Sequence, residues 1–290
     1  MIENKSYQIT FNIIYLFIAI IMILPLVLLF VSSITDNNAL IANGYSFFPA
    51  KLSLEAYGYM LTNSSTIVRA YMITIIVTAL GTFIGLAITT MMSFALSIRN
   101  LPGNRIISFL VFFTMLFNGG LVPSYIMWTN LGVVNTIWAY VFPFFLTNAF
   151  NIVLIRSYFV SSIPKELYES AKIDGAGYFR VFFKMALPLG KPIIATVGLF
   201  SCLLYWNDWL NGLYFITDPS LYSIQALLNR MSQNIQSVIN SSASSTSVLN
   251  LPQASIRMAI AFVAILPILV LYPFIQKYFA NGIMKGAIKG

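Results

Sequence analysis

Long apolar runs separated by short polar intervals dominate the chain from one end to the other. Runs of roughly 20 residues or more are long enough to cross a hydrocarbon core of about 30 Å as α-helices. Such runs cover residues 11–33, 69–98, 105–128, 134–159, 192–212 and 257–279. The pattern predicts an all-α integral membrane protein with six transmembrane helices in a single transmembrane domain, residues 1–290.

The distribution of Lys and Arg between the ends of these runs gives their orientation, because cytoplasmic ends carry an excess of basic residues. If the N-terminus is cytoplasmic, 12 of the 16 Lys and Arg residues lie on the cytoplasmic side. The other four are Lys51, Arg69, Arg230 and Arg257. Both termini and the 160–190 loop are therefore expected in the cytoplasm, and residues 34–67 and 213–256 are expected outside it.

The amino-acid composition is that of a membrane protein, in agreement with the predicted spans. Hydrophobic residues make up 59% of the chain and charged residues 8%, whereas a soluble domain carries about a quarter charged residues. The net charge of +8 fits the basic cytoplasmic ends beside anionic lipid, so the charge does not call for a nucleic-acid partner.

Several kinds of chemistry are excluded by the residues that are missing. The sequence has no histidine and one cysteine, Cys202, which falls within an apolar run and is expected to be a small buried residue. Gly190-Lys191 is followed by Pro192 and lacks the glycine-rich cradle of a phosphate-binding loop. We therefore expect no metal site, no ATP binding and no enzymatic activity in this chain.

Ionisable residues within the apolar runs would mark an ion or proton pathway. They occur only near the ends of the runs, as Arg69, Arg156, Asp208 and Arg257. This distribution argues against a proton-coupled or sodium-coupled carrier. The energy for transport would then come from another subunit, or the protein would be a passive channel.

The interval Glu169–Pro188 is the longest charge-rich stretch in the chain. It predicts a short helix, a turn at Gly175 with a positive φ, a second short helix and a stop at Leu187-Pro188. Leu167, Tyr168 and Ala171 would form one apolar stripe for the groove of a partner. Such a polar helix-turn-helix suits attachment of a soluble partner, and the alternative is an ordinary amphipathic helix at the membrane surface.

The same interval closely resembles the EAA loop of ATP-binding-cassette importer permeases, which has the pattern E-A-A, three residues, G, nine residues, I-x-L-P. This chain has Glu169-Ser170-Ala171, then Gly175, then Met185-Ala186-Leu187-Pro188. Ser170 and Met185 depart from the pattern but keep a compatible size or polarity. The resemblance implies a type I importer permease fold and a coupling helix that sits in a cleft of the ATPase. The residues it assigns to ATPase coupling are Leu167, Glu169, Ala171, Asp174, Gly175, Arg180, Leu187 and Pro188.

Further segments resemble carbohydrate permeases related to MalG, in particular the branch that serves alginate and pectin-oligosaccharide import. These segments are 117–125, 131–136, 205–209, 272–278 and 286–290, so the resemblance covers nearly the whole chain. Asn118-Gly119-Gly120 with Pro123 would break the third span next to a polar cavity, or would simply end a helix at the outer interface.

The resemblance and the aromatic-amide chemistry together give candidate residues for the translocation path. Aromatic rings stack on sugars and amide or carboxylate groups bind hydroxyls, although Trp and Tyr also anchor helices at membrane interfaces. The candidates are Asn118, Tyr125, Trp206, Asn207, Asp208 and Trp209. In MalG-like permeases the loop between the last two spans reaches into the substrate-binding protein, which makes Asp218, Tyr222 and Gln225 candidates for that contact.

The resemblance thus implies the permease subunit of an oligosaccharide importer in a bacterial cytoplasmic membrane. Its expected partners are a second, related permease in a heterodimer, two ATPase subunits, an extracytoplasmic substrate-binding protein, the sugar and membrane lipid. ATP and Mg would be bound by the partner ATPase, with no cofactor in this chain. The alternatives are the same architecture importing a non-sugar solute, and a stand-alone secondary carrier or channel.

Overall fold

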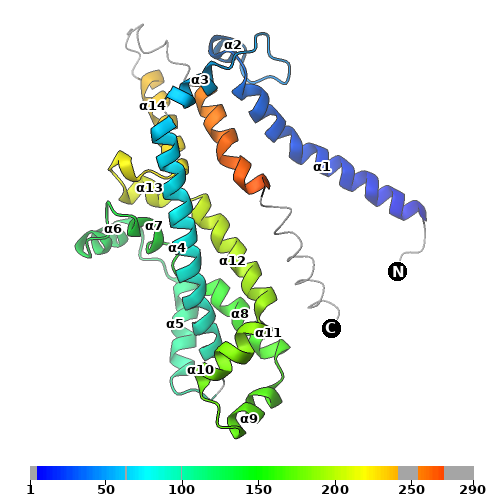
Figure 1. Ribbon diagram of the computed structural model, residues 1–290, viewed down its shortest axis with the longest axis vertical. Coiled ribbons are helices and arrows are strands. Elements are labelled where there is room, and N and C mark those ends of the chain that lie inside the picture. Colours follow the sequence, from blue (N-terminus) through cyan, green and yellow to red (C-terminus); the bar gives the residue numbers. More distant parts are fainter. Residues whose placement is uncertain (1–4, 63, 99, 241–253, 271–290) are drawn as a thin grey trace. The chain divides into compact units, whose positions relative to one another are not determined.

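A computed structural model describes residues 5–62, 64–98, 100–240 and 254–270. Within these ranges the chain is helical, with no strand beyond one isolated bridge between Thr35 and Leu52 (Figure 1). Contacts divide the described chain into two compact units. Residues up to Val68 together with Leu227–Val270 form unit 1, and Arg69–Ala226 form unit 2.

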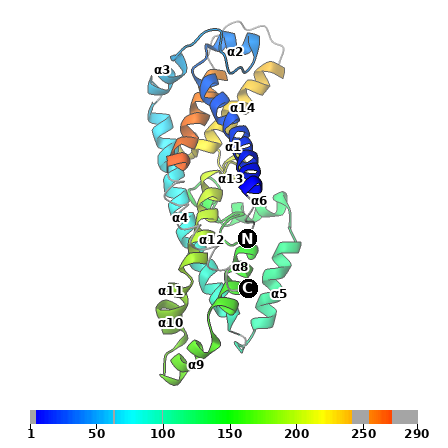
Figure 2. The same ribbon diagram turned by 90° about the vertical axis from the view of Figure 1, so that its right-hand side faces the viewer.

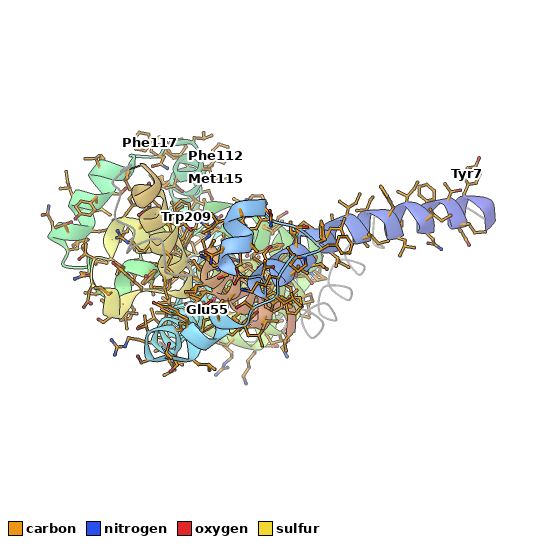
Figure 3. The ribbon with its side chains drawn as sticks, turned by 90° about the horizontal axis from the view of Figure 1, so that it is seen from above. Tyr7, Glu55, Phe112, Met115, Phe117 and Trp209 are labelled. Carbon is orange, nitrogen blue, oxygen red and sulfur yellow. The ribbon has the colours of Figure 1, made fainter. Side chains whose placement is uncertain are left out.

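Unit 1 combines one long apolar helix, most of which is uncovered, with several shorter helices. It holds α1 (Lys5–Ser33), α2 (Asn37–Asn43), α3 (Glu55–Thr62), most of α14 (Ile224–Asn240) and a further helix, Ala254–Val270. Most side chains of α1 are exposed, for example Tyr7 at its start (Figure 3) and Met22 in its middle, whereas Ser32 and Ser33 at its end are buried. A helix that is apolar all round suits a lipid environment. The rings of Phe30 and Phe262, 4.9 Å apart, join α1 to the Ala254–Val270 helix.

The connection after α1 is fixed by polar contacts. Asp36 caps α2 by accepting a hydrogen bond from the Ala39 N–H at 3.2 Å, and it pairs with the Lys51 ammonium at 3.2 Å. The hydrogen bond from Lys51 lowers the pKa of the Asp36 carboxyl. Residues 34–67 also contain the short helix α3, and Leu54 and Leu61 beside and within it are both exposed.

Unit 2 contains the part of α4 (Ser64–Ser97) from Arg69 onward and all elements up to the start of α14. In chain order these are α5 (Asn104–Leu116), α6 (Leu121–Asn130), α7 (Trp138–Val141), α8 (Ala149–Ser162), α9 (Lys165–Ile173), α10 (Tyr178–Val181), the π-helix η1 (Phe182–Ala186), α11 (Leu187–Leu189), α12 (Lys191–Trp206), α13 (Leu210–Phe215) and the 3₁₀ turn η2 (Pro219–Leu221). In both ribbon views, α9 lies at the end of unit 2 opposite α13 (Figures 1 and 2).

Every one of the six predicted spans contains helix, but their continuity differs. Two described segments, Tyr7–Ser33 and Ser64–Ser97, are by length and composition able to cross a membrane alone, and a third span would be the bent pair Tyr178–Leu189 and Lys191–Trp206. The predicted break at Asn118-Gly119-Gly120 is confirmed, since α5 ends at Leu116 and α6 begins at Leu121. The sixth span is described only as far as Val270.

The span predicted over 134–159 is interrupted in the structure. α7 ends at Val141 and α8 begins at Ala149, with residues 142–148 outside any helix. Pro143 lies in this break and has no N–H for a helical hydrogen bond. Asn148 then starts α8 as its N-cap, because its side-chain oxygen accepts a hydrogen bond from the Asn151 N–H at 3.2 Å.

Two glycines allow other parts of unit 2 to approach α4 closely. A Cβ at Gly81 would lie 2.5 Å from the ring of Tyr205, and a Cβ at Gly85 would lie 2.9 Å from the Leu146 carbonyl oxygen. Tyr205 is itself held in place, because its hydroxyl donates a hydrogen bond to the Val141 carbonyl at 3.1 Å. Gly81 and Gly85 therefore let the Tyr205 ring and the Leu146 carbonyl pack directly against α4.

We expect Gly81→Ala to lower the stability of the purified protein by about 1–3 kcal/mol, because the added methyl overpacks the Tyr205 ring. Thermal unfolding in detergent measures the effect. Gly58→Ala is the matched control, because nothing lies within 4 Å of a Cβ at Gly58. Equal melting temperatures for the two variants would contradict this account of the α4 contact.

Candidate functional site

The 160–190 loop forms a helix, a tight turn and a second helical segment. α9 ends in a turn where the Ala176 N–H donates to the Ala171 carbonyl at 2.9 Å, the hydrogen bond of a Schellman cap. Gly175 in this turn has φ 73°, which confirms the positive φ predicted from the sequence. Side chains disfavour this conformation, so glycine is the residue that fits it.

The second helical segment continues past its predicted stop. α10, η1 and α11 run without a break to Leu189, and the chain then bends by 80° into α12. The segment thus ends one residue after the predicted stop at Leu187-Pro188, which is confirmed to within the usual uncertainty of a helix end. η1 is a π-helix in which the Leu187 N–H donates to the Phe182 carbonyl, five residues back. A Cβ at Gly190 would lie 2.6 Å from the Phe159 ring, so the bend occurs where only glycine fits.

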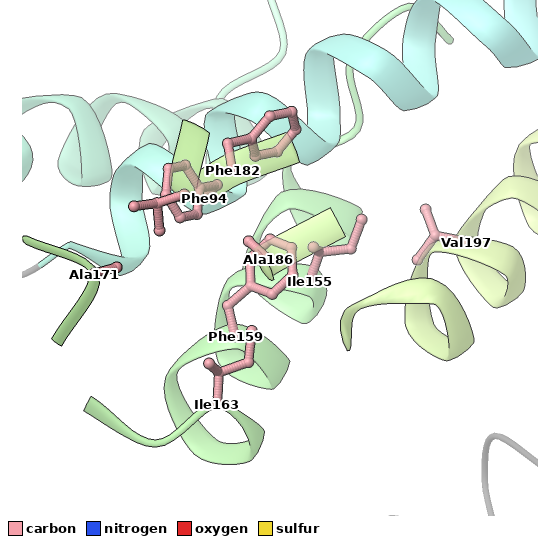
Figure 4. Close-up of a cluster of buried hydrophobic side chains, with 9 residues drawn as sticks. Phe94, Ile155, Phe159, Ile163, Ala171, Phe182, Ala186 and Val197 are labelled. Atoms are coloured by element: carbon pink, nitrogen blue, oxygen red, sulfur yellow. The ribbon is translucent and has the colours of Figure 1, made fainter. Parts of the chain in front are cut away.

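A buried cluster holds this loop against the helices of unit 2. It combines Phe94 of α4, Phe159 of α8 and Phe182 of η1 with residues of α9 and α12 (Figure 4). The Phe94 ring lies 5.2 Å from Phe182 and 6.3 Å from Phe159. We call this the coupling cluster; its buried members are Phe94, Ile155, Phe159, Ile163, Ala171, Val181, Phe182, Ala186 and Val197.

The apolar stripe predicted on α9, formed by Leu167, Tyr168 and Ala171, partly packs into the coupling cluster. Ala171 is 8% exposed within the cluster, and the ring of Tyr168 packs 6.2 Å from Phe94. The expectation that these two residues face a partner's groove is wrong, because they attach α9 to its own chain. Leu167, in contrast, is exposed. The other candidate coupling residues are likewise either exposed or packed against the cluster. Glu169, Asp174, Gly175, Arg180 and Pro188 are exposed, whereas Leu187 is half-buried against the cluster.

A cavity of about 670 Å³ lies elsewhere in unit 2, where α8 begins and α12 ends. Asn207, Asp208 and Trp209 line it, as do residues from the break before α8. Its walls combine aromatic rings with amide and carboxylate groups, the chemistry that fits a hydroxyl-rich ligand with apolar faces. The full lining is Phe145, Asn148, Phe150, Asn151, Phe200, Leu203, Leu204, Asn207, Asp208, Trp209 and Leu210.

Asp208 is the most constrained polar residue of this cavity. It is 3% exposed, and its carboxylate accepts hydrogen bonds from the Asn211 backbone N–H at 3.0 Å and from the Asn211 side-chain amide at 2.7 Å. The Asn211 amide also donates to the Pro143 carbonyl at 3.3 Å. The segment after α12 is therefore tied to the break before α8.

The sequence identified part of this cavity and missed the rest. Of the candidate path residues, Asn207, Asp208 and Trp209 line it, and Trp206 is buried beside them without lining it. Asn118 instead binds the Gly120 N–H at 2.8 Å, and Tyr125 stacks on Phe215 with ring centres 6.0 Å apart. Asn148 and Asn151 were missed. Their signal was the presence of two amides and Pro143 within an apolar run.

The candidates for binding-protein contact lie in two places. Asp218 and Tyr222 belong to the segment Ile216–Tyr222, which we call the outer segment. The Asp218 carboxylate accepts a hydrogen bond from the Ser220 N–H at 2.8 Å, which lowers the pKa of that carboxyl. The Tyr222 hydroxyl donates to the Thr217 carbonyl at 3.2 Å. Gln225, on the first turn of α14, lies beside Asn207 at 3.5 Å and so borders the cavity.

A helical membrane chain with interrupted spans, a polar cavity and a helix-turn-helix loop has the features of a transport permease. Residues 70–285 match the family described as "Binding-protein-dependent transport system inner membrane component", and the chain belongs to this family. It is therefore a multi-pass transport subunit of the cytoplasmic membrane and not an enzyme. Membership in this family also implies ATPase and substrate-binding-protein partners.

Several proteins are similar to the chain over nearly its whole length. The "Polygalacturonan/rhamnogalacturonan transport system permease protein YtcP" of Bacillus subtilis (strain 168) is 34% identical over 291 aligned residues, covering 99% of this chain and 100% of the relative. "Protein LplC" of the same organism is 36% identical over 271 residues, covering 93% and 90% of the two chains.

A solved structure shares the fold. A chain from the "Crystal structure of a bacterial ABC transporter involved in the import of the acidic polysaccharide alginate" superimposes with a TM-score of 0.78. The two chains are 26% identical, and the match covers 96% of this chain and 98% of the other. The predicted all-α importer-permease fold is confirmed by this likeness and by the family match.

We expect Asp208→Ala to destabilise the protein by about 1–3 kcal/mol, because it removes the acceptor of the buried Asn211 backbone N–H and of one of the two N–H groups of its amide. Thermal unfolding in detergent measures the change. Glu55→Gln, which alters an exposed carboxylate at the start of α3, serves as the control and should stay close to wild type. A wild-type melting temperature for Asp208→Ala would contradict the role given to this carboxylate.

Proposed function

We propose that this chain is one of two permease subunits of an ATP-binding-cassette importer for oligosaccharides or polysaccharide fragments. The relatives named for polygalacturonan, rhamnogalacturonan and alginate transport support a saccharide substrate. The aromatic and amide lining of the cavity supports the same substrate class. A stand-alone carrier is disfavoured by membership in a binding-protein-dependent family.

One observation carries the mechanism: two helices connect the coupling cluster to the cavity. α8 contributes Phe159 to the cluster and Asn151 to the cavity, and α12 contributes Val197 and Leu204 in the same way. On each helix the two residues are seven or eight positions apart, which is about 10–12 Å along the helix axis. A displacement of the loop at one end is thereby transmitted to the cavity walls at the other.

In this proposal, the exposed residues Leu167, Glu169, Asp174 and Arg180 contact an ATPase subunit on the cytoplasmic side. Ala171 and Leu187 hold the loop to its own chain, while Gly175 and Pro188 shape it. ATP and Mg bind between two partner ATPase subunits, whose closure shifts α9. The coupling cluster moves α8 and α12 with it, so the cavity changes its access from the cytoplasm to the outside.

The other permease subunit supplies the second half of the pathway. Phe112, Met115 and Phe117 project from unit 2 together and are all exposed (Figure 3). Exposed apolar side chains of this kind suit contact with lipid or with the second permease. Substrate arrives from the extracytoplasmic binding protein, which docks on the outer segment through Asp218 and Tyr222, with Gln225 between that surface and the cavity.

We expect Gly175→Val to leave the subunit inserted and assembled but to uncouple ATP hydrolysis from uptake. A β-branched residue resists the left-handed turn and so changes the position of α9. Gly177→Ala is the matched control in the same turn, because Gly177 has φ −70° and open space around it. Uptake by reconstituted complexes should fall at least about tenfold for Gly175→Val and stay near wild type for Gly177→Ala. Normal uptake by Gly175→Val would contradict the coupling assignment.

We expect Trp209→Ala to lower saccharide uptake by about tenfold, because the cavity loses an aromatic face, while Trp209→Phe keeps most of the activity. Trp209 is 44% exposed, so the truncation removes little internal packing. Initial uptake rates at several substrate concentrations separate weaker binding from slower transport. Equal rates for the two variants would mean that this ring does not contact the sugar.

A further inference from the structure

Two residues with strained backbones meet at one point of unit 2. Among the described residues, Asn135 and Phe144 are the non-glycine positions with positive φ, 62° and 61°. This conformation is disfavoured for residues that carry a side chain, although Asn tolerates it better than most. Both residues contact Phe215. The Asn135 N–H donates to the Phe215 carbonyl at 2.8 Å, and the Phe144 ring lies 5.9 Å from the Phe215 ring.

Asn135 also binds the beginning of the outer segment through its side chain. Its amide oxygen accepts hydrogen bonds from the Thr217 N–H at 3.1 Å and from the Asp218 N–H at 2.9 Å. A carbonyl oxygen has two lone pairs, so both are in use. With the backbone bond to Phe215, one residue makes three hydrogen bonds to three positions of the chain about 80 residues away.

The other end of the outer segment is fixed as firmly. The buried hydroxyl of Tyr140 accepts a hydrogen bond from the Ser223 N–H at 3.1 Å and donates to the Leu221 carbonyl at 3.2 Å. The Ile224 N–H donates to the Thr74 hydroxyl at 2.9 Å. The residues between the two ends, including Thr217 and Pro219, are exposed or half-buried. The segment is therefore a surface loop with one defined shape.

Burial does not explain the contacts of Asn135 with this loop. Its two side-chain hydrogen bonds lie at exposed positions, where water would satisfy the Thr217 and Asp218 N–H groups equally well. The hydrogen bonds to Asn135 are therefore not needed to satisfy these N–H groups. Their effect is to hold the outer segment in one conformation. Strain of this kind is found where a fold holds a functional surface in a required conformation.

We propose that Asn135 is a positioning residue that holds the outer segment in a preformed shape for docking of the binding protein on which this family depends. The inference rests on the proposed function. A surface fixed before binding loses less conformational entropy on association, so it binds more tightly than the same residues in a mobile loop. Phe144 joins the same junction to the cavity, because the next residue, Phe145, is part of the cavity wall.

Two substitutions separate the side-chain oxygen from the backbone conformation. Asn135→Gly keeps the left-handed φ without steric cost and removes the acceptor. Asn135→Asp keeps an acceptor in the same place. The assay uses the reconstituted importer with its own binding protein, and measures ATPase activity against binding-protein concentration.

The half-saturating concentration of binding protein should rise about tenfold or more for Asn135→Gly and stay within about twofold of wild type for Asn135→Asp. The rate at saturating binding protein should stay near wild type in both, whereas a general structural defect would lower that rate. An unchanged half-saturating concentration for Asn135→Gly overturns the inference, as does equal damage by Asn135→Asp.

Hydrogen exchange in the wild-type complex gives a second test that does not depend on any variant. The amides of Thr217 and Asp218 should exchange slowly despite their exposed positions, and fast exchange overturns the inference. If no binding protein stimulates the wild-type complex at all, the proposed function itself fails. Stimulation that is insensitive to Asn135→Gly overturns the positioning role alone.

Discussion

The packing of Phe94, Phe159 and Phe182 is the interaction on which the rest of unit 2 depends. Without it, α9 and its turn would be a short polar helix with no fixed position, since an isolated helix of this length is marginal in water. The coupling cluster gives the loop a rigid connection to three helices, and two of these lead to the cavity. Buried aromatic packing, and not the charges of the loop, therefore fixes the loop to the helices of the subunit.

The cavity requires interrupted helices, and interruptions in a membrane leave backbone groups in need of partners. Asn211 meets this need by donating to the Pro143 carbonyl, while Asp208 accepts from Asn211. Asn148 caps α8 at the other side of the same break. Asp208 and Asn148 thus stabilise the broken backbone as well as lining the cavity. Asp208 and Asn211 are also buried, where each satisfies polar groups of the other.

Features set by local chemistry were predictable from the sequence. Gly175 and the Asn118-Gly119-Gly120 break depend on glycine itself, and both are present as predicted. Features set by contacts between distant residues were not. The break after Val141 is held by Asn211, the bend at Gly190 is set by Phe159, and the direction in which Tyr168 and Ala171 face is set by Phe94. Each of these partners is distant in sequence from the segment that it contacts. The apolar run at 134–159 therefore gave no sign of its break, and the apolar stripe on α9 gave no sign that it packs against its own chain.

The central claim is that this chain works as the membrane subunit of an ATP-driven importer. The most direct measurement is purification of the tagged chain from native membranes in a mild detergent, with identification of the proteins that accompany it and assay of their ATPase activity. The account predicts recovery of a second permease and an ATPase in one active complex. Recovery of the chain alone, in a stable form that transports solute without ATP, would contradict it.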